Sequence, residues 1–185
     1  MKSKQVAHFS RWTGRSQLIL PWQTIQPCLL LGAIVLFVVI PTLWLGCTPS
    51  ALAEDYNKEF LVGADFSNRV LTDSSFTKAN LRGSNFTHSD LSGVSFFGAN
   101  LEGANLEGAN LSNATLDTAR LTSANLTNAV LEGAFAFNAK FEGAIVDGAD
   151  FSAVELRQDA QMLLCKSAKG INPTTKRATR ETLNC

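Results

Sequence analysis

The chain has 185 residues, of which 45% are hydrophobic and 17% charged, and its 16 basic and 16 acidic residues give a formal net charge of zero. This composition excludes a disordered or collagen-like chain, and it argues against a nucleic-acid-binding protein driven by net positive charge. The zero conceals an uneven distribution, because no acid precedes Glu54: residues 1–53 carry four bases (+4), and the remaining 12 bases and 16 acids give −4.

The first segment of the chain has the features of an export signal. Residues 1–27 form a basic n-region without acids, and residues 28–46 form an almost wholly apolar h-region. Ala51 and Ala53 are small residues at the two positions that a signal peptidase reads, so we expect cleavage after Ala53 and before Glu54. Residues 1–53 are therefore predicted to be a signal peptide.

Two other fates of this segment remain open. The apolar run approaches the ~20 residues that cross a bilayer, so residues 28–46 would anchor an uncleaved chain in a membrane. Cys47 follows Leu45 and Gly46 as in a lipoprotein cleavage site, although Trp44 stands where that motif prefers a smaller aliphatic residue. We expect membrane contact only through an uncleaved leader.

After a lead-in at 54–60, the sequence from Leu61 to Leu156 repeats every five residues without interruption. The first position is Leu or Phe except at Ala136 and Val146, and every glycine of the tract occupies the third position. Five-residue spacing distributes the Leu and Phe side chains around all faces of a helix and alternates them across a strand. The period therefore excludes one amphipathic helix and one continuous strand.

Each pentad instead suits a short extended piece that ends in a corner. Gly or Asn at the third position fits a type II turn, which needs a positive φ there. Lys78, Thr118 and Ser123 fit that position less well, so we expect a different corner type at these three residues.

The pentads at 99–103 and 104–108 read Ala-Asn-Leu-Glu-Gly and resemble the A(D/N)LxG motif of the pentapeptide-repeat family. The resemblance implies an all-β solenoid, a right-handed quadrilateral β-helix with four pentads in each coil and about five coils over 61–156. The first-position side chains would then stack inside it as a core ladder. This predicted ladder comprises Leu61, Phe66, Leu71, Phe76, Leu81, Phe86, Leu91, Phe96, Leu101, Leu106, Leu111, Leu116, Leu121, Leu126, Leu131, Phe141, Val146 and Phe151.

Three outward phenylalanines are the candidate partner patch. Phe97 and Phe137 share a column two coils apart, and Phe135 flanks it. Exposed apolar clusters on soluble proteins often mark binding surfaces. Two structural alternatives remain open: a local slip could turn a ring inward to replace the bulk missing at Ala136, or the tail could cover the patch.

The outward polar residues give no pattern of a catalytic, cofactor or metal site. The second-position carboxylates scatter over four faces, whereas paired-carboxylate catalysis needs a converging pair in a cleft. His88 lies at a corner beside Ser89 and Asp90, and an exposed turn supplies no oriented base or oxyanion site. We expect no enzyme activity, no cofactor, no metal and no nucleic-acid partner.

Residues 157–185 are predicted to cap the solenoid, because an open β-helix end exposes strand edges and core. Apolar residues at helical spacing favour a short helix over about 157–167, and Gly170 and Pro173 then mark its end. Cys165 and Cys185 are the only cysteines that remain after cleavage, and an exported context favours a disulfide between them. The two cysteines are widely separated in sequence, unlike those of a Cys-x-x-Cys motif. This separation favours a structural disulfide, and redox regulation of the bond stays open.

The stretch from Cys165 to Cys185 is similar to the C-terminal module of pentapeptide-repeat proteins of the cyanobacterial and chloroplast thylakoid lumen. This similarity implies a non-enzymatic structural or interaction module, with an unknown protein partner, exported to the thylakoid lumen or periplasm. The alternative within the family is a DNA mimic that binds gyrase. Residues 54–156, with 6 bases and 14 acids, carry −8 and permit mimicry, but their carboxylates form no continuous stripe.

Overall fold

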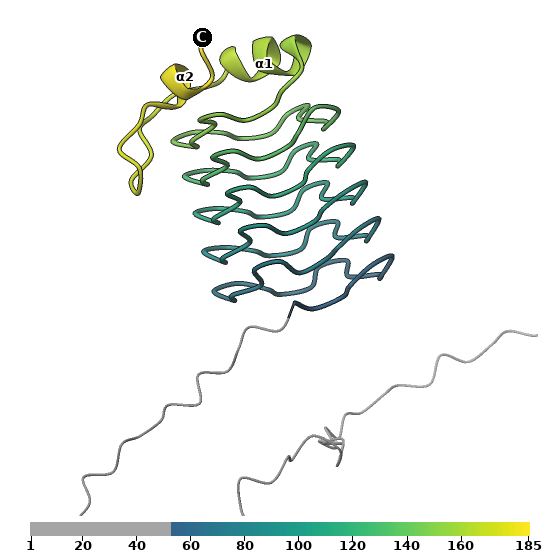
Figure 1. Ribbon diagram of the computed structural model, residues 1–185. Helices are drawn as coiled ribbons and strands as arrows, with labels where there is room; N and C mark the ends of the chain where they lie inside the picture. The colour runs from purple at the N-terminus through teal and green to yellow at the C-terminus, as the bar shows by residue number, and fades with distance from the viewer. Residues whose placement is uncertain (1–52) are drawn as a thin grey trace, which may run out of the picture. The chain divides into compact units, whose positions relative to one another are not determined.

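Residues 53–185 are described by the computed structural model, in which regular coils stack into a solenoid (Figure 1). The n-region, the h-region and Ala51 of the predicted leader lie outside the described residues. From Asp55 onward, every fifth residue forms a parallel bridge with the residue 20 positions later, and the last such pair is Phe135 with Glu155. Four bridges in each 20 residues make every coil four-sided, with strands reduced to single bridge residues.

The coils are joined by main-chain hydrogen bonds in both directions. The Asn105 N–H donates to the Ser84 carbonyl of the preceding coil at 2.9 Å, and the Leu106 N–H donates to the Asn125 carbonyl of the next at 2.8 Å. This pattern recurs at almost every bridge, so each coil fixes the backbone register of its neighbours.

The corners have one common geometry. At a typical corner the Ala104 N–H donates to the Leu101 carbonyl at 3.0 Å while Gly103 has φ +65°. Lys78, Thr118 and Ser123 have φ values of 58°, 58° and 57°, so the expectation of different corners at these residues is wrong. The pairing of each coil with the next evidently outweighs the local cost of a left-handed non-glycine residue, about 1–2 kcal/mol.

One corner does differ, at a residue that the sequence did not single out. Among the third-position residues from 58 to 153, Asn138 alone lacks a positive φ. Its N–H and its side-chain amide both donate to the Asp117 carboxylate, at 3.0 and 3.1 Å.

The core is a stack of first-position side chains lined by the fourth-position residues, mostly alanines. In the early coils the rings of Phe66 and Phe86 stack at 5.0 Å, those of Phe76 and Phe96 stack at 5.2 Å, and rings from the two columns meet edge to face. The later ladder residues are buried as well. Leu61 is only half buried, because it belongs to the first coil and no described coil lies beneath it.

Residues 54–60 are not a lead-in but part of the first coil. Asp55 and Phe60 pair with Ser75 and Asn80, and the Tyr56 ring stacks on Phe76 at 4.6 Å. Tyr56 thus occupies the first position of an additional pentad. Sequence reading missed it because that pentad carries neither Leu or Phe at its first position nor Gly or Ala at its third and fourth.

Two helices cover the C-terminal end of the solenoid (Figure 1): α1, Gln158–Cys165, and α2, Thr179–Thr182. The first lies within the expected range 157–167, and the second was not expected. Leu164 and Leu183 are buried against the core. Within residues 53–185, no helix is long and apolar enough to cross a membrane.

Candidate interaction surface

The three phenylalanines of the patch lie on one side of the solenoid and are exposed. Phe97, Phe135 and Phe137 expose 40%, 48% and 54% of their surface, while Ala136 between the last two is fully buried. Neither neighbouring ring has turned inward, so the structure excludes the slip that the small Ala136 suggested.

Rings from adjacent sides compensate for the small residue inside. Phe141 and Phe151 occupy the first positions of the two sides that flank Ala136, and their ring centroids lie 6.4 Å apart. Both side chains are almost fully buried. The core therefore remains filled without recruiting a ring of the patch.

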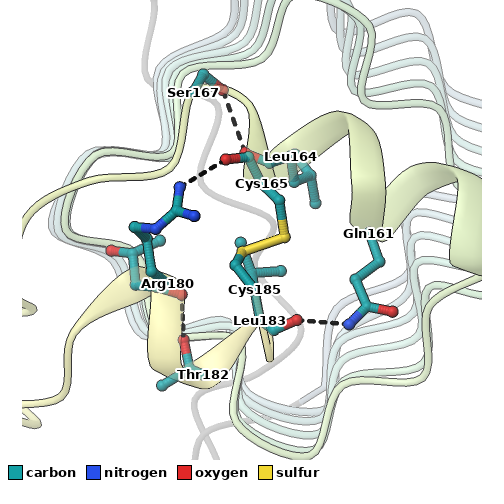
Figure 2. The surroundings of a disulfide bond; sticks show 9 residues. Gln161, Leu164, Cys165, Ser167, Arg180, Thr182, Leu183 and Cys185 are labelled. Carbon is teal, nitrogen blue, oxygen red and sulfur yellow. Dashed lines mark hydrogen bonds between the residues drawn. A yellow bond between two sulfur atoms is a disulfide. The ribbon is translucent and has the colours of Figure 1, made fainter.

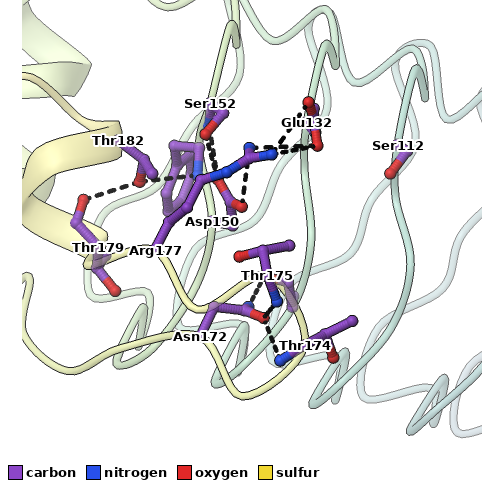
Figure 3. A network of polar contacts seen from close by, with 12 residues as sticks. Ser112, Glu132, Asp150, Ser152, Asn172, Thr174, Thr175, Arg177, Thr179 and Thr182 are labelled. Carbon is purple, nitrogen blue, oxygen red and sulfur yellow. Dashed lines mark hydrogen bonds and ion pairs between the residues drawn. The ribbon is translucent and has the colours of Figure 1, made fainter.

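The tail leaves the patch exposed: α1 lies beside Phe137 without covering it, and residues 171–178 are bound to another part of the coils. The Asn172 side-chain amide donates to the main-chain carbonyls of Asn128, Ala129 and Gly148 at 3.1, 3.1 and 2.8 Å. Arg177 forms ion pairs with Glu132 at 3.2 Å and Asp150 at 3.3 Å (Figure 3). These contacts fix residues 171–178 beside the corner at 128–129.

Asp150 is the buried charge of this network. Burial alone would raise the pKa of its carboxyl, but hydrogen bonds from the Ser152 hydroxyl and N–H, with the nearby Arg177 guanidinium, hold the pKa below its ordinary value. The ionised carboxylate therefore fastens the tail to the coils.

The predicted disulfide between Cys165 and Cys185 is present and joins α1 to the end of the chain, with Cα atoms 5.7 Å apart (Figure 2). The contacts around it are also between the two helical segments. Arg180 donates to the Cys165 carbonyl at 2.8 Å, and the Gln161 amide donates to the Leu183 carbonyl at 2.6 Å. The staple thus belongs to a cap that is also held by hydrogen bonds.

A groove lies between residues 137–142 of the coils and α1, with a volume of about 460 Å³. Apolar side chains from both elements line it, and Phe137 belongs to this groove as well as to the patch. The groove and the patch are therefore one continuous surface.

Comparison with known proteins agrees with this architecture. The model of the pentapeptide repeat region matches residues 69–151. The crystal structure of a pentapeptide repeat protein from the Arabidopsis thaliana thylakoid lumen is 46% identical, with a TM-score of 0.69, and the match covers 70% of this chain and 90% of that one. The chain belongs to the pentapeptide-repeat family.

Two further relatives match this pentapeptide-repeat chain over a shorter stretch or at lower identity. A thylakoid lumenal 15 kDa protein of the Arabidopsis thaliana chloroplast is 58% identical over 38 residues, which are 20% of this chain and 17% of the relative. The chain thus spans about a sixth of the length of that curated protein. A pentapeptide repeat protein of the cyanobacterium Cyanothece 51142 is 28% identical, with a TM-score of 0.44, over 54% of this chain and 80% of that one.

The outward charges of the pentapeptide coils form mixed groups. Glu102 lies between two cations, with Arg82 at 3.5 Å and Arg120 at 3.7 Å. Over residues 53–185, no group of three or more His, Cys, Asp or Glu side chains is arranged to hold a metal ion. His88 lies beside Gly108 of the next coil, at a corner with φ 55°.

The groove was missed by sequence reading. It joins residues 137–142 to the groove-facing side of α1, and the repeat pattern does not say where a helix outside the repeat will lie. A local signal did exist, because Asp159, Met162 and Lys166 recur at helical spacing on a side of α1 that does not face the core.

Proposed function

We propose that this pentapeptide-repeat protein is a non-enzymatic protein-interaction module of the thylakoid lumen, built on the right-handed quadrilateral β-helix of its family. The observation that carries the proposal is the exposed patch of Phe97, Phe135 and Phe137 on one side of the solenoid. Large exposed apolar side chains that lie together mark binding surfaces more often than isolated ones do. The thylakoid-lumen relative that matches over most of its length supports the compartment.

The patch is also built to stay in place. Phe135 is a bridge residue between Thr115 and Glu155, so its backbone is held on both sides. A binding surface on regular elements needs little ordering when a partner docks, which lowers the entropic cost of association.

The rival functions within the family have less support here. A gyrase-binding DNA mimic needs rows of carboxylates, whereas Glu102 is flanked by Arg82 and Arg120. A redox function of the disulfide has less support because its two cysteines are widely separated and form no Cys-x-x-Cys pair. Asn172 and Arg177 hold the tail independently of the disulfide.

The test is affinity purification with tagged residues 54–185 from the lumen and membrane fractions of thylakoids. The described contacts of the coils and cap all fall within this segment. A partner retained by the natural sequence should be lost by the double variant Phe97→Ser/Phe137→Ser. The matched control is Phe60→Ser/Val70→Ser, which removes exposed apolar side chains from the first coil, away from the patch.

The proposal fails if the patch variant, shown to be folded by circular dichroism, retains every partner. Equal loss in both variants would also contradict it, because the binding would then follow general apolar exposure rather than the patch.

A further inference from the structure

The groove beside α1 offers an apolar floor that the cap leaves open. α1 buries Leu164 against the core, but Met162 and Leu163 remain 56% and 36% exposed. Phe137 faces them across the groove and is exposed, and the nearly buried Ala139 and Phe141 also line that side. A volume of about 460 Å³ is within the range of sites that enclose a drug-sized group, so one or two bulky side chains fit.

Cations flank this floor on both walls. Lys140 stands on the coil side and Lys166 on the α1 side, and neither ammonium group has an ion pair with any residue from 53 to 185. Arg157 is paired with Asp159 at 3.2 Å. The carboxylate of Glu142 also lines the groove and does not cancel both ammonium groups.

A further basic side chain stands on the preceding coil. Lys140 is the bridge partner of Arg120, so their side chains project from neighbouring rows about 4.8 Å apart. Both residues line a second hollow that adjoins the groove through Lys140 and Glu142. The two hollows together present four basic and two acidic side chains, namely Arg120, Lys140, Arg157, Lys166, Glu142 and Asp159. Arg120 is also paired with Glu102 at 3.7 Å, so the unpaired positive charge of this corner lies on Lys140 and Lys166. With Glu102 included, the corner still has four basic and three acidic side chains, on coils that carry −8 over residues 54–156.

We propose that the groove binds a short acidic segment of another protein that carries a bulky apolar side chain. The apolar side chain enters between Phe137 and Met162, and carboxylates on either side of it meet Lys140 and Lys166. This inference rests on the proposed function and adds the chemistry of the partner. The acidic character follows from charge complementarity, which speeds encounter and selects the partner.

The probe is the peptide acetyl-Asp-Glu-Leu-Phe-Glu-Asp-amide, titrated into 15N-labelled residues 54–185 and followed by amide chemical shifts. Shifts should cluster at residues 137–142 and 159–166. Two matched peptides divide the contributions: one replaces all four acids by Lys, and the other replaces Leu-Phe by Ser-Ser. We expect each to bind at least about ten-fold more weakly.

The decisive variant is Lys140→Glu/Lys166→Glu. It should lower the affinity for the acidic peptide by about ten-fold or more and raise the affinity for the Lys peptide. Met162→Glu should weaken the binding of both peptides that contain Leu-Phe, the acidic one and the Lys one. The matched control Lys58→Glu/Lys176→Glu changes net charge equally, but Lys58 lies on the first coil and Lys176 lies in the bend beside the corner at 128–129. Its affinity for the acidic peptide should differ by less than about three-fold.

Several results would overturn the inference: no shifts at millimolar peptide, shifts confined to other sides of the coils, or equal binding of the Lys peptide. A concentration-dependent dimer that produces the same shifts without peptide would assign the groove to a second copy instead. If a partner from thylakoid extracts is lost with Phe97→Ser/Phe137→Ser but kept with Lys140→Glu/Lys166→Glu, the inference fails and the proposed function stands.

Discussion

At the scale of single residues, the corners show how neighbouring coils impose a backbone conformation. Ala153 has φ 54° and an exposed side chain, although an alanine gains nothing locally from the left-handed region. Its corner closes through the Val154 N–H, which donates to the Phe151 carbonyl at 3.2 Å. The left-handed conformation of Ala153 is therefore stabilised by the coil and not by a preference of the residue itself.

Replacing this alanine should stabilise the protein. We expect Ala153→Gly to raise the free energy of unfolding by about 0.5–1 kcal/mol, because relief of the left-handed strain exceeds the added flexibility of the unfolded chain. The measurement is urea unfolding of residues 54–185. Ala124→Gly, in the buried fourth position, is the opposite control and should lose stability. A loss in both variants would mean that the strain is not stored at the corner.

Asp150 gives a pH-dependent prediction. Its folded pKa lies below its ordinary value of 3.8, so its stabilisation is present above that pH and is lost as the pH falls through the folded pKa. We expect Asp150→Asn to lower the free energy of unfolding by about 1–3 kcal/mol at pH 7. The difference from the natural sequence should shrink below pH 3.8.

Thermal unfolding at a series of pH values measures this difference. Glu142→Gln is the control, since that carboxylate is exposed and should change stability by less than about 0.5 kcal/mol. A gap for Asp150→Asn that is independent of pH would show that packing, and not charge, fastens the tail.

At the scale of elements, the coils and the cap were predictable to different degrees. The five-residue period predicted short extended pieces with corners, and the resemblance to the pentapeptide-repeat family implied the four-sided coils. The pentad of Tyr56 was not predicted because it carries other residues at the motif positions. The corner type at Lys78 and Thr118 was predicted wrongly because pairing between coils outweighs the turn preference of these residues. The bend of residues 171–178, where Ile171 pairs antiparallel with Ala178, depends on contacts with corners far away in sequence.

The disulfide prediction belongs to this scale. Breaking the bond with Cys165→Ser/Cys185→Ser should cost about 3 kcal/mol in the chain-entropy model, since it closes a loop of 20 residues. Hydrogen exchange should quicken in 157–185 and remain slow in the coils below. The control is reductant, which should destabilise the natural sequence and leave the double variant unchanged. Uniformly faster exchange would show that the cap and coils unfold as one unit.

At the scale of the whole molecule, the zero net charge separates into parts with different roles. The coils from 54 to 156 carry −8, and residues 157–185, with six bases and two acids, carry +4. Composition predicted this polarity but not its location in space. The basic groove became visible only when α1 was placed against residues 137–142.

Leader removal can be read from fluorescence. The three tryptophans are Trp12, Trp22 and Trp44, and Tyr56 is the single tyrosine. We expect the protein isolated from the lumen to show tyrosine emission only, because cleavage after Ala53 removes every indole. The full-length chain expressed without processing is the control and should emit as tryptophan. Indole emission from the lumenal form would indicate a retained leader.

Because each bridge residue pairs with the one 20 positions later, residues 20 apart lie on the same side of the solenoid and residues five apart lie on adjacent sides. Deleting one whole pentad between Phe97 and Phe135, such as 101–105, would preserve the apolar interior but rotate everything after it by a quarter turn, separating Phe97 from Phe135 and Phe137. Deleting 20 residues, such as 101–120, would shorten the rod and leave these rings in phase. Changes of length in this chain therefore act on its surfaces as a rotation, so only whole-coil insertions and deletions keep its two ends facing the same direction.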